Sequence, residues 1–313
     1  MAHAIHPSDG YITMPDGVRL FYRKTGSGPQ VLLPNGFHLF DDFQRFAARR
    51  TLIFYDVRNR GQSDSVTDPS KLANGILQDA DDLDAVRRHF EITRLDAIAH
   101  SYIGVMLGLY AKKYPSHLSR MILLGPMQPN AATQYPAHLT NADSTLAEVL
   151  SRLAELQKQR SSPDQDPREA CEKFWSALRP IYVANPVDAG KIKWSRCDLP
   201  NERNFMKYWI GSILPSIQRL HFSPADLANA KAPVLIVHGV KDRSSPYGGG
   251  RDWALLFPNA RLLTVENAAH APWIEAPDLV FSSIQTFLDG HWPDAARTIT
   301  SLDPRDEPAR ING

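Results

Sequence analysis

The sequence has little cysteine, almost no net charge and no long apolar run, and each shortage argues against a class of protein. Its 35 basic and 34 acidic side chains leave a formal charge of +1 over 313 residues. Such a balance gives no electrostatic basis for a nucleic-acid partner. No apolar run approaches the roughly 20 residues that span a bilayer, so no membrane partner is expected. The first residues also lack the basic segment and apolar stretch of a secretory signal, and we expect a cytoplasmic protein.

The two cysteines and the densest group of acidic residues are the candidates for a metal site. Cys171 and Cys197 lack the spacing of paired metal ligands. In a reducing compartment, free thiols are expected rather than a disulfide. Four aspartates between residues 79 and 84 suggest a metal site, but favourable charge near the start of a helix accounts for them better. We therefore expect no metal and no cofactor.

Short aliphatic segments alternate with amphipathic segments through most of the chain. Strands that alternate with helices predict an α/β fold, in which a mainly parallel sheet has helices on both faces. The expected strands are three within residues 10–36, then 51–57, 95–99, 120–126, 234–241 and 261–269, and the expected helices are 40–48, 76–90, 103–113 and 277–288.

The alternation stops after Pro126 and resumes near residue 230. Between these points the apolar residues of 146–153 fall on one helix face, and Asp166-Pro167 is typical of a helix start. Residues 204–214 are predicted to form a further apolar-rich helix. The pattern therefore predicts a helical insertion between two strands. We expect an α/β core formed by residues 1–127 and 226–290, a helical cap (lid) of residues 128–225, and a peripheral C-terminal tail of residues 291–313.

Polar residues interrupt the apolar stretch LDAIAHSYIGVMLGLY of residues 95–110. The first part suits a buried strand, and the second part has the apolar spacing of one helix face. Ser101 therefore lies at a strand-to-helix junction, where a sharp turn presents the hydroxyl as in a nucleophile elbow. Ile103 stands where such a turn normally has glycine, and Gly104 is expected to supply the close packing instead. A serine that only caps a helix is the alternative.

Two further polar residues follow expected strands of the same sheet. Asp242 comes after the strand that ends near residue 240, and His270 comes after the next strand. Open α/β sheets place their sites at the carboxyl ends of the strands. Residues 127–130, which follow the preceding strand, contain no carboxylate, so Asp242 is the expected acid. His100 and His238 are expected to have structural roles.

The order serine, acid, histidine resembles that of the α/β-hydrolase superfamily with a helical cap. A D-x-R-x-x-G-x-S loop at residues 56–63 adds to the resemblance, and a structural role is expected for it. The resemblance implies that Ser101 is the nucleophile and that His270 removes its proton. It also implies that Asp242 holds the imidazole in the right tautomer.

The same resemblance implies an oxyanion hole made by the backbone N–H groups of Tyr102 and Phe37. His38 lies in the loop of Phe37 and is a candidate for contact with substrate. Trp175 and Trp209 are aromatic residues of the expected cap, and an apolar pocket would suit such a lining. We therefore expect these three side chains to bind substrate.

The overall layout most resembles the proline iminopeptidase group. Two departures weaken that assignment: residues 34–38 read PNGFH in place of the H-G-G-P-G loop, and Tyr102 replaces the tryptophan after the nucleophile. An aminopeptidase also needs an acidic group for the free amine. Glu169, Glu172 and Glu202 are acidic cap residues, and the sequence singles out none of them.

We expect a serine hydrolase that cleaves an ester, lactone or amide bond of a small, fairly apolar molecule through an acyl-enzyme intermediate. An aminopeptidase of the iminopeptidase type is the alternative within this class. A non-hydrolytic lyase or a ligand receptor is the alternative from another class, because one fold serves many functions. The expected partner is a small-molecule substrate. The sequence does not decide between a monomer and a homodimer.

Overall fold

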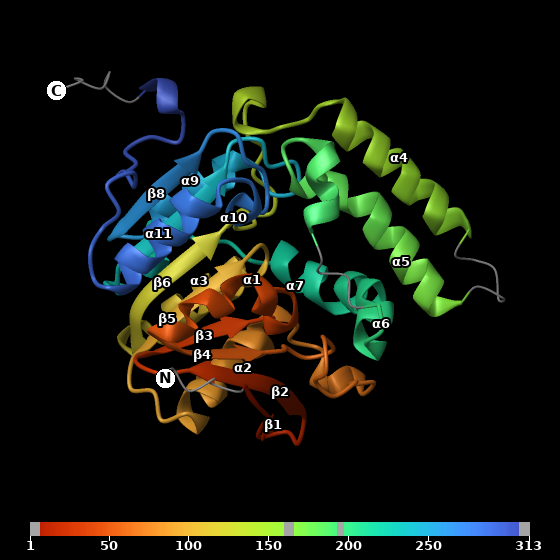
Figure 1. Ribbon diagram of the computed structural model, residues 1–313, viewed down its shortest axis with the longest axis horizontal. Helices are drawn as coiled ribbons and strands as arrows, with labels where there is room; N and C mark the ends of the chain where they lie inside the picture. The colour runs from red at the N-terminus through yellow and green to blue at the C-terminus, as the bar shows by residue number, and fades with distance from the viewer. Residues whose placement is uncertain (1–6, 160–165, 193–196, 307–313) are drawn as a thin grey trace.

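A large sheet runs through the centre of the molecule (Figure 1). The computed structural model describes residues 7–159, 166–192 and 197–306. The strands are β1 Ser8–Thr13, β2 Arg19–Gly26, β3 Gln30–Pro34, β4 Thr51–Tyr55, β5 Leu95–His100, β6 Leu118–Leu124, β7 Val234–Gly239 and β8 Ala260–Val265.

The eight strands lie in the spatial order β1-β2-β4-β3-β5-β6-β7-β8. The pairs β1–β2 and β2–β4 are antiparallel, and the other neighbouring strands are parallel. The predicted mainly parallel α/β sheet is therefore confirmed. Its carboxyl-terminal edge receives the ends of β5, β7 and β8, which precede Ser101, Asp242 and His270.

Helices connect and cover the strands. Among the described residues, no helix is long and apolar enough to cross a membrane. The helices are α1 Phe40–Phe43, α2 Ile76–His89, α3 Ile103–Lys113, α4 Ser144–Gln159, α5 Pro167–Leu178, α6 Pro200–Tyr208, α7 Leu214–Gln218, α8 Pro224–Leu227, α9 Tyr247–Leu256, α10 Pro272–Glu275 and α11 Pro277–Leu288.

Helices cover both faces of the sheet. Successive residues of a strand point to opposite sides, so they pack against different helices. Leu32 of β3 belongs to a core cluster with residues of α2, α3 and α9. Its neighbours Val31 and Leu33 belong to a second cluster with residues of α1 and α11. Ala97 and Ile98 of β5 divide between the two clusters in the same way. The sheet is thus a buried layer, as the predicted fold requires.

Three helical segments differ from the expectation. Helix α9 is not expected from the sequence, because its first turn contains the glycine run of residues 248–250, which is typical of a turn. The helix expected at 40–48 ends early, and a 3-10 turn, Gln44–Ala48, follows α1. The helix expected near 204–214 divides into α6, a π-helical turn at Trp209–Ile213, and α7.

The segment between β6 and β7 carries α4 to α8, and within the described residues it contains no strand. Figure 1 shows α4, α5 and α6 standing to the right of the sheet, away from α9 and α11. The helix start expected at Asp166-Pro167 is confirmed, since the Asp166 carboxylate accepts the Arg168 N–H at 3.0 Å. The division of the chain into a core and a cap stays a prediction.

The segment that follows α11 packs against the sheet over its described part. Arg297 forms an antiparallel bridge with Leu262 of β8. Arg251 of α9 donates to the carbonyl oxygens of Ser301 and Leu302 at 2.8 and 2.6 Å. The backbone bridge and the two side-chain bonds fix residues 297–302 along the outer edge of the sheet.

Cys171 and Cys197 form a disulfide, so the prediction of free thiols is wrong. Helix α5 and the turn before α6 bring their Cα atoms to 5.9 Å, although the two residues are 26 positions apart in sequence. Both sulfurs are buried with Trp175. Disulfides persist mainly in oxidising compartments. The bond therefore favours an oxidising compartment over the predicted cytoplasm. The cytoplasmic location itself stays a prediction.

Candidate active site

Ser101 occupies a strained turn between β5 and α3. Its φ of 60° lies in the left-handed region that few residues other than glycine adopt. The Ser101 N–H donates to the Leu124 carbonyl at 3.0 Å, and the Ser101 carbonyl accepts from Gly104 and Met127 at 2.9 and 3.2 Å. Gly104 supplies the close packing, because a Cβ there would lie 3.0 Å from the Pro126 Cβ. The predicted junction is confirmed, and its strain is of the kind found at functional sites.

Asp242 and His270 form a buried pair beside this turn. His270 Nδ1 lies 2.8 Å from Asp242 Oδ2. The other carboxylate oxygen accepts the backbone N–H groups of Ser244 and Ser245 at 2.7 and 2.8 Å. Burial alone would raise the pKa of Asp242, but its charge interaction with His270 and its hydrogen bonds to the two histidines hold that pKa at about 2. Asp242 is thus an anion that places the hydrogen of His270 on Nδ1.

A second imidazole contacts the same carboxylate oxygen. His238 Nε2 lies 3.1 Å from Asp242 Oδ2 and 3.0 Å from the Ser245 carbonyl oxygen. Both of these atoms are acceptors, so Nε2 carries the hydrogen. His238 Nδ1 faces Gly250 and has no hydrogen-bond partner in the described part of the chain. His238, expected to be structural, therefore donates directly to the acid that contacts His270.

Two more histidines connect His270 with the loop of Phe37. His100 Nε2 lies 3.0 Å from the His270 carbonyl oxygen and so carries the hydrogen, and His100 Nδ1 accepts from His38 Nε2 at 3.3 Å. Burial lowers the pKa of His38 to about 3, and the charge of Arg60 acts in the same direction. Burial also holds the pKa of His100 well below its usual value. Both rings are therefore neutral hydrogen-bonding groups at neutral pH.

The two backbone N–H groups expected to form an oxyanion hole differ in their partners. The Tyr102 N–H, at the start of α3, has no acceptor among the residues that the structure describes. The Phe37 N–H donates to Asp56 Oδ1 at 3.0 Å. The cause is the turn Gly36–His38, which follows Asn35 in the left-handed region and directs this N–H towards the 56–63 loop. The expectation that the Phe37 N–H is available to a reacting oxygen is not met in this arrangement.

Asp56 connects the Phe37 turn with the D-x-R-x-x-G-x-S loop. Its second oxygen accepts the Gln62 N–H at 2.8 Å. Gly61 has a φ of 49° and lies so close that a Cβ there would overlap the carboxylate. Burial raises the pKa of Asp56 to about 7, against the effect of its backbone hydrogen bonds. The 56–63 loop thus holds the turn that contains Phe37 and His38.

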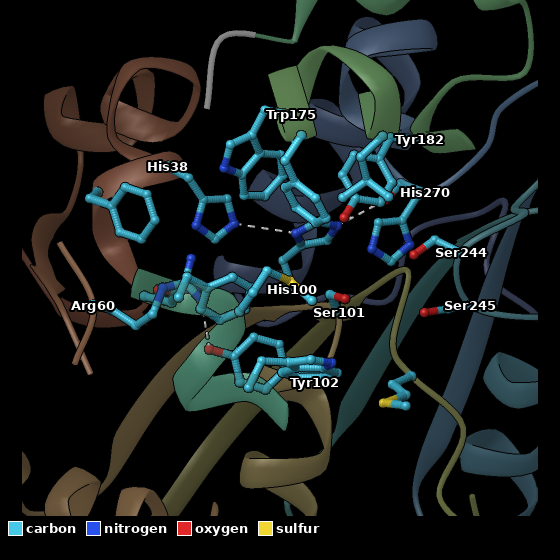
Figure 2. Close-up of a pocket in the computed structure, with 18 of the residues that line it drawn as sticks. His38, Arg60, His100, Ser101, Tyr102, Trp175, Tyr182, Ser244, Ser245 and His270 are labelled. Atoms are coloured by element: carbon cyan, nitrogen blue, oxygen red, sulfur yellow. Dashed lines mark hydrogen bonds between the residues drawn. The ribbon is translucent and has the colours of Figure 1, made fainter. Parts of the chain in front are cut away.

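The expected site residues surround one cavity of about 310 Å³ (Figure 2). His38, Trp175 and Trp209 all line it, together with Ser101, Tyr102, His270 and the Phe37 side chain, whereas Asp242 is not a lining residue and lies behind His270. The sequence-derived residues therefore meet in space, and their catalytic roles stay predictions. The apolar and aromatic lining is completed by Met127, Leu153, Phe174, Leu178, Tyr182, Phe205 and Met206.

Ser101 and His270 face this cavity without a direct bond between their side chains. Within the described residues, the hydrogen bonds of His270 run to Asp242 and, through its carbonyl oxygen, to His100. Tyr182 stacks on the His270 ring with 5.0 Å between ring centres. Catalytic hydrogen bonds are often long before substrate binds. The proton transfer from Ser101 to His270 that the resemblance implies stays a prediction.

Arg60 lines the cavity and is not singled out by the sequence. It belongs to the 56–63 loop and is 3% exposed. Its Nε and Nη2 donate to Glu202 of α6 at 2.9 and 3.0 Å, and its Nη1 donates to the Tyr102 hydroxyl at 2.9 Å. Because Arg60 occupies one of the variable positions of the D-x-R-x-x-G-x-S pattern, the motif carries no signal for it.

The described lining of the cavity includes no acidic side chain. Both oxygens of Glu202 are engaged by Arg60, and one of them also accepts the Gly61 N–H at 2.8 Å. Glu169 and Glu172 form ion pairs within the exposed surface of α5. None of the three expected acidic candidates therefore offers a free carboxylate to an amine in this cavity.

The chain is similar over most of its length to proteins of one fold family. A family profile described as alpha/beta hydrolase fold matches residues 33–277. The chain is 29% identical over 290 residues to the proline iminopeptidase PfmaB of Pestalotiopsis fici, which covers 88% of this chain and 97% of that protein. It is 26% identical over 282 residues to a bifunctional esterase/perhydrolase of Acinetobacter calcoaceticus, covering 85% and 95%.

Solved structures agree with this fold. The 2-hydroxy-6-oxo-6-phenylhexa-2,4-dienoate hydrolase of a Rhodococcus strain superposes with a TM-score of 0.70 at 17% identity, covering 92% of this chain and 100% of that one. An esterase from Exiguobacterium antarcticum superposes with a TM-score of 0.66 at 18% identity, covering 90% and 99%. At such identities the likeness concerns the fold alone.

Proposed function

Because the chain belongs to the α/β-hydrolase fold family, we propose that it is a serine hydrolase that cleaves an ester, lactone or amide bond of a small, fairly apolar molecule. One observation carries the proposal. A serine in a strained turn, with φ of 60°, shares a cavity with a histidine whose Nδ1 is 2.8 Å from a buried carboxylate. In such an arrangement the histidine and the carboxylate activate the serine hydroxyl for acyl transfer.

In the proposed reaction Ser101 Oγ attacks the substrate carbonyl carbon while His270 accepts the hydroxyl proton. Since Nδ1 of His270 is bound to Asp242, Nε2 is the nitrogen left to act as the base. Asp242 stabilises the imidazolium, which then protonates the leaving oxygen or nitrogen. The acyl group stays on Ser101 until water, deprotonated by the same His270, releases it as the acid.

The developing oxyanion needs donors that are already in place. The Tyr102 N–H has no described acceptor and belongs to the residue after the nucleophile, so it serves as the first donor. The Phe37 N–H serves as the second donor only if its bond to Asp56 is exchanged for one to the oxyanion. Each such donor contributes about 3 to 4 kcal/mol to the transition state.

The lining of the cavity supports a small apolar acyl group over a free amine. Aromatic and aliphatic side chains from α5 and α6 form much of its wall. Arg60 is the one charged lining residue among those described, apart from histidines, and it is a cation. The similarity to an iminopeptidase keeps the aminopeptidase as a second candidate, but the cavity lining that the structure describes has no carboxylate for an amine.

The test compares substrates and labels the nucleophile. Purified protein is assayed with p-nitrophenyl esters from acetate to octanoate, with lactones, and with proline p-nitroanilide. We expect ester or lactone turnover with a kcat/KM above that for the proline amide. A fluorophosphonate probe should label the wild type and a Ser244→Ala control, but not Ser101→Ala. A higher kcat/KM for the proline amide would favour the aminopeptidase, and an unlabelled, inactive wild type would contradict the proposal.

A further inference from the structure

We infer that Arg60 and the Tyr102 hydroxyl form a subsite for a second, uncharged oxygen of the substrate, such as a ketone or ether oxygen away from the scissile bond. The inference rests on the proposed hydrolase function and adds what the substrate carries besides its reactive bond. It starts from hydrogen-bond donors that the protein leaves unused.

The Arg60 guanidinium has more donors than the protein satisfies. An arginine side chain carries five N–H groups. Two of them donate to Glu202 and one donates to the Tyr102 hydroxyl. One N–H on each of Nη1 and Nη2 is left without an acceptor in the described chain. Since Arg60 is 3% exposed and lines the cavity, an acceptor inside the cavity is the remaining partner.

Tyr102 adds a third donor at the same place. Its hydroxyl oxygen accepts from Arg60 at 2.9 Å, which leaves its own hydrogen to be donated. No acceptor for that hydrogen lies among the described residues, and the side chain lines the cavity. Burial raises the pKa of Tyr102 to about 12, so the hydroxyl keeps its hydrogen at neutral pH. Two N–H groups of Arg60 and the hydroxyl hydrogen of Tyr102 are thus available to an acceptor supplied by the ligand.

The surroundings of Arg60 leave the N–H edge of its guanidinium as the surface that can bind a ligand. The guanidinium carbon lies 3.9 Å from the centre of the Phe205 ring and 5.0 Å from that of Phe37. These rings cover the guanidinium plane, whereas its N–H groups point outward within that plane. Figure 2 shows Arg60 and Tyr102 on one side of Ser101, with His270 on the other side. A substrate attacked by Ser101 can therefore extend away from His270 towards these donors.

Charge balance favours an uncharged oxygen over a carboxylate. Glu202 neutralises Arg60, and each of the two residues is 3% exposed. A substrate carboxylate would place a second anion beside a single buried cation, at a desolvation cost of several kcal/mol. Burial, with the charge of Glu202, already raises the pKa of the nearby Asp56 to about 7. A ketone or ether oxygen accepts the same hydrogen bonds without adding charge.

Matched esters test the inference. The p-nitrophenyl esters of 4-oxopentanoate, 5-oxohexanoate and 6-oxoheptanoate are compared with those of 4-methylpentanoate, 5-methylhexanoate and 6-methylheptanoate, in which a methyl group replaces the ketone oxygen. We expect the wild type to favour at least one ketone ester over its methyl partner by about tenfold in kcat/KM. Turnover of the methyl esters without any ketone preference would overturn the inference and leave the proposed function standing. Absence of turnover with all six esters would count against the proposed function itself.

Variants assign the preference to the two residues. Arg60→Met combined with Glu202→Gln removes the donors without leaving a buried charge, and Tyr102→Phe removes one donor while keeping the ion pair. We expect the ketone preference to fall to about twofold or less in the double variant and by about threefold in Tyr102→Phe. Arg58→Met with Asp82→Asn removes a second buried ion pair, which joins the same loop to α2 outside the cavity, and should keep the wild-type preference. A preference that survives in both test variants would overturn the inference.

Discussion

His238 lies 3.1 Å from the same Asp242 oxygen that His270 contacts at 2.8 Å. Two donors therefore share the negative charge of one carboxylate oxygen. The bond from His238 draws charge away from the side of Asp242 that faces His270. His238 is thus a positioning residue for the proposed reaction, since it acts through Asp242.

Removing that second donor should change the pH profile as well as the rate. In His238→Phe, Asp242 interacts more strongly with the protonated form of His270. We expect the acidic limb of kcat/KM to move to higher pH by about half a unit to one unit, with up to a tenfold loss at neutral pH. His238→Gln, which can donate from its amide, should restore part of the profile. An unshifted acidic limb in His238→Phe would mean that the residue only fills space.

Ser101→Ala should abolish turnover without unfolding the protein. Alanine keeps the backbone of the turn, which is held by bonds to Leu124, Gly104 and Met127, and removes only the hydroxyl. We expect turnover of any substrate found by screening to fall by about four to six orders of magnitude. Circular dichroism and thermal melting should match the wild type within a few degrees. Equal turnover in the two proteins would mean that Ser101 only begins a helix.

The disulfide should contribute substantially to stability. It closes a loop of 26 residues between α5 and the start of α6, which lowers the entropy of the unfolded chain by the equivalent of about 3 to 4 kcal/mol. We expect Cys171→Ala combined with Cys197→Ala to lower the free energy of unfolding by about that amount. Dithiothreitol should lower the melting temperature of the wild type and leave that of the double variant unchanged. A wild type insensitive to the reductant would contradict this expectation.

Asp79 should make stability fall as pH rises. Neither of its carboxylate oxygens has a partner among the described residues, and burial raises its pKa well above the usual value. The unfolded chain loses this proton near pH 4, whereas the folded chain keeps it to higher pH. The stabilisation is therefore complete below pH 4 and is lost as pH rises through the folded-state pKa.

Asp79→Asn removes this pH dependence. We expect equal stability of variant and wild type near pH 4 and a more stable variant at pH 8, by about 1.4 kcal/mol for each unit of pKa shift. Urea unfolding at pH 4, 6 and 8 measures the difference. Asp81→Asn is the matched control. Asp81 lies on the same helix α2 as Asp79, and its carboxylate forms a surface ion pair with Lys113 of α3. A constant difference between Asp79→Asn and the wild type across this range would contradict the expectation.

Features set by short stretches of sequence are predicted well. The turn at Ser101 and the helix start at Asp166-Pro167 each depend on a few adjacent residues, and both are found. The order of Ser101, Asp242 and His270 follows from strands whose carboxyl ends meet at one edge. Parallel pairing therefore brings distant parts of the chain together in a way that the sequence pattern anticipates.

Features set by long-range packing are not predicted. Arg60 meets Glu202 across 142 positions, and neither residue lies at a conspicuous site in the sequence. Cys171 and Cys197 pair because α5 and α6 pack together, which cysteine spacing alone does not indicate. The glycines of α9 favour a turn locally, yet Gly250 allows the helix to approach His238 so closely that a Cβ would overlap its ring. In each case a tertiary contact outweighs the local preference.

The bond between Arg60 and Glu202 also bears on how such proteins diversify. Exchange of the helices between β6 and β7 with those of a relative would bring in a new residue at position 202 and leave Arg60 unchanged. Without an acid there, a fully desolvated cation would lose its counter-charge, at a cost of about 3 to 5 kcal/mol. Recombination at the two ends of the helical segment thus separates residues that need one another. The 56–63 loop and the helices are expected to be inherited together, as one unit split across the sequence.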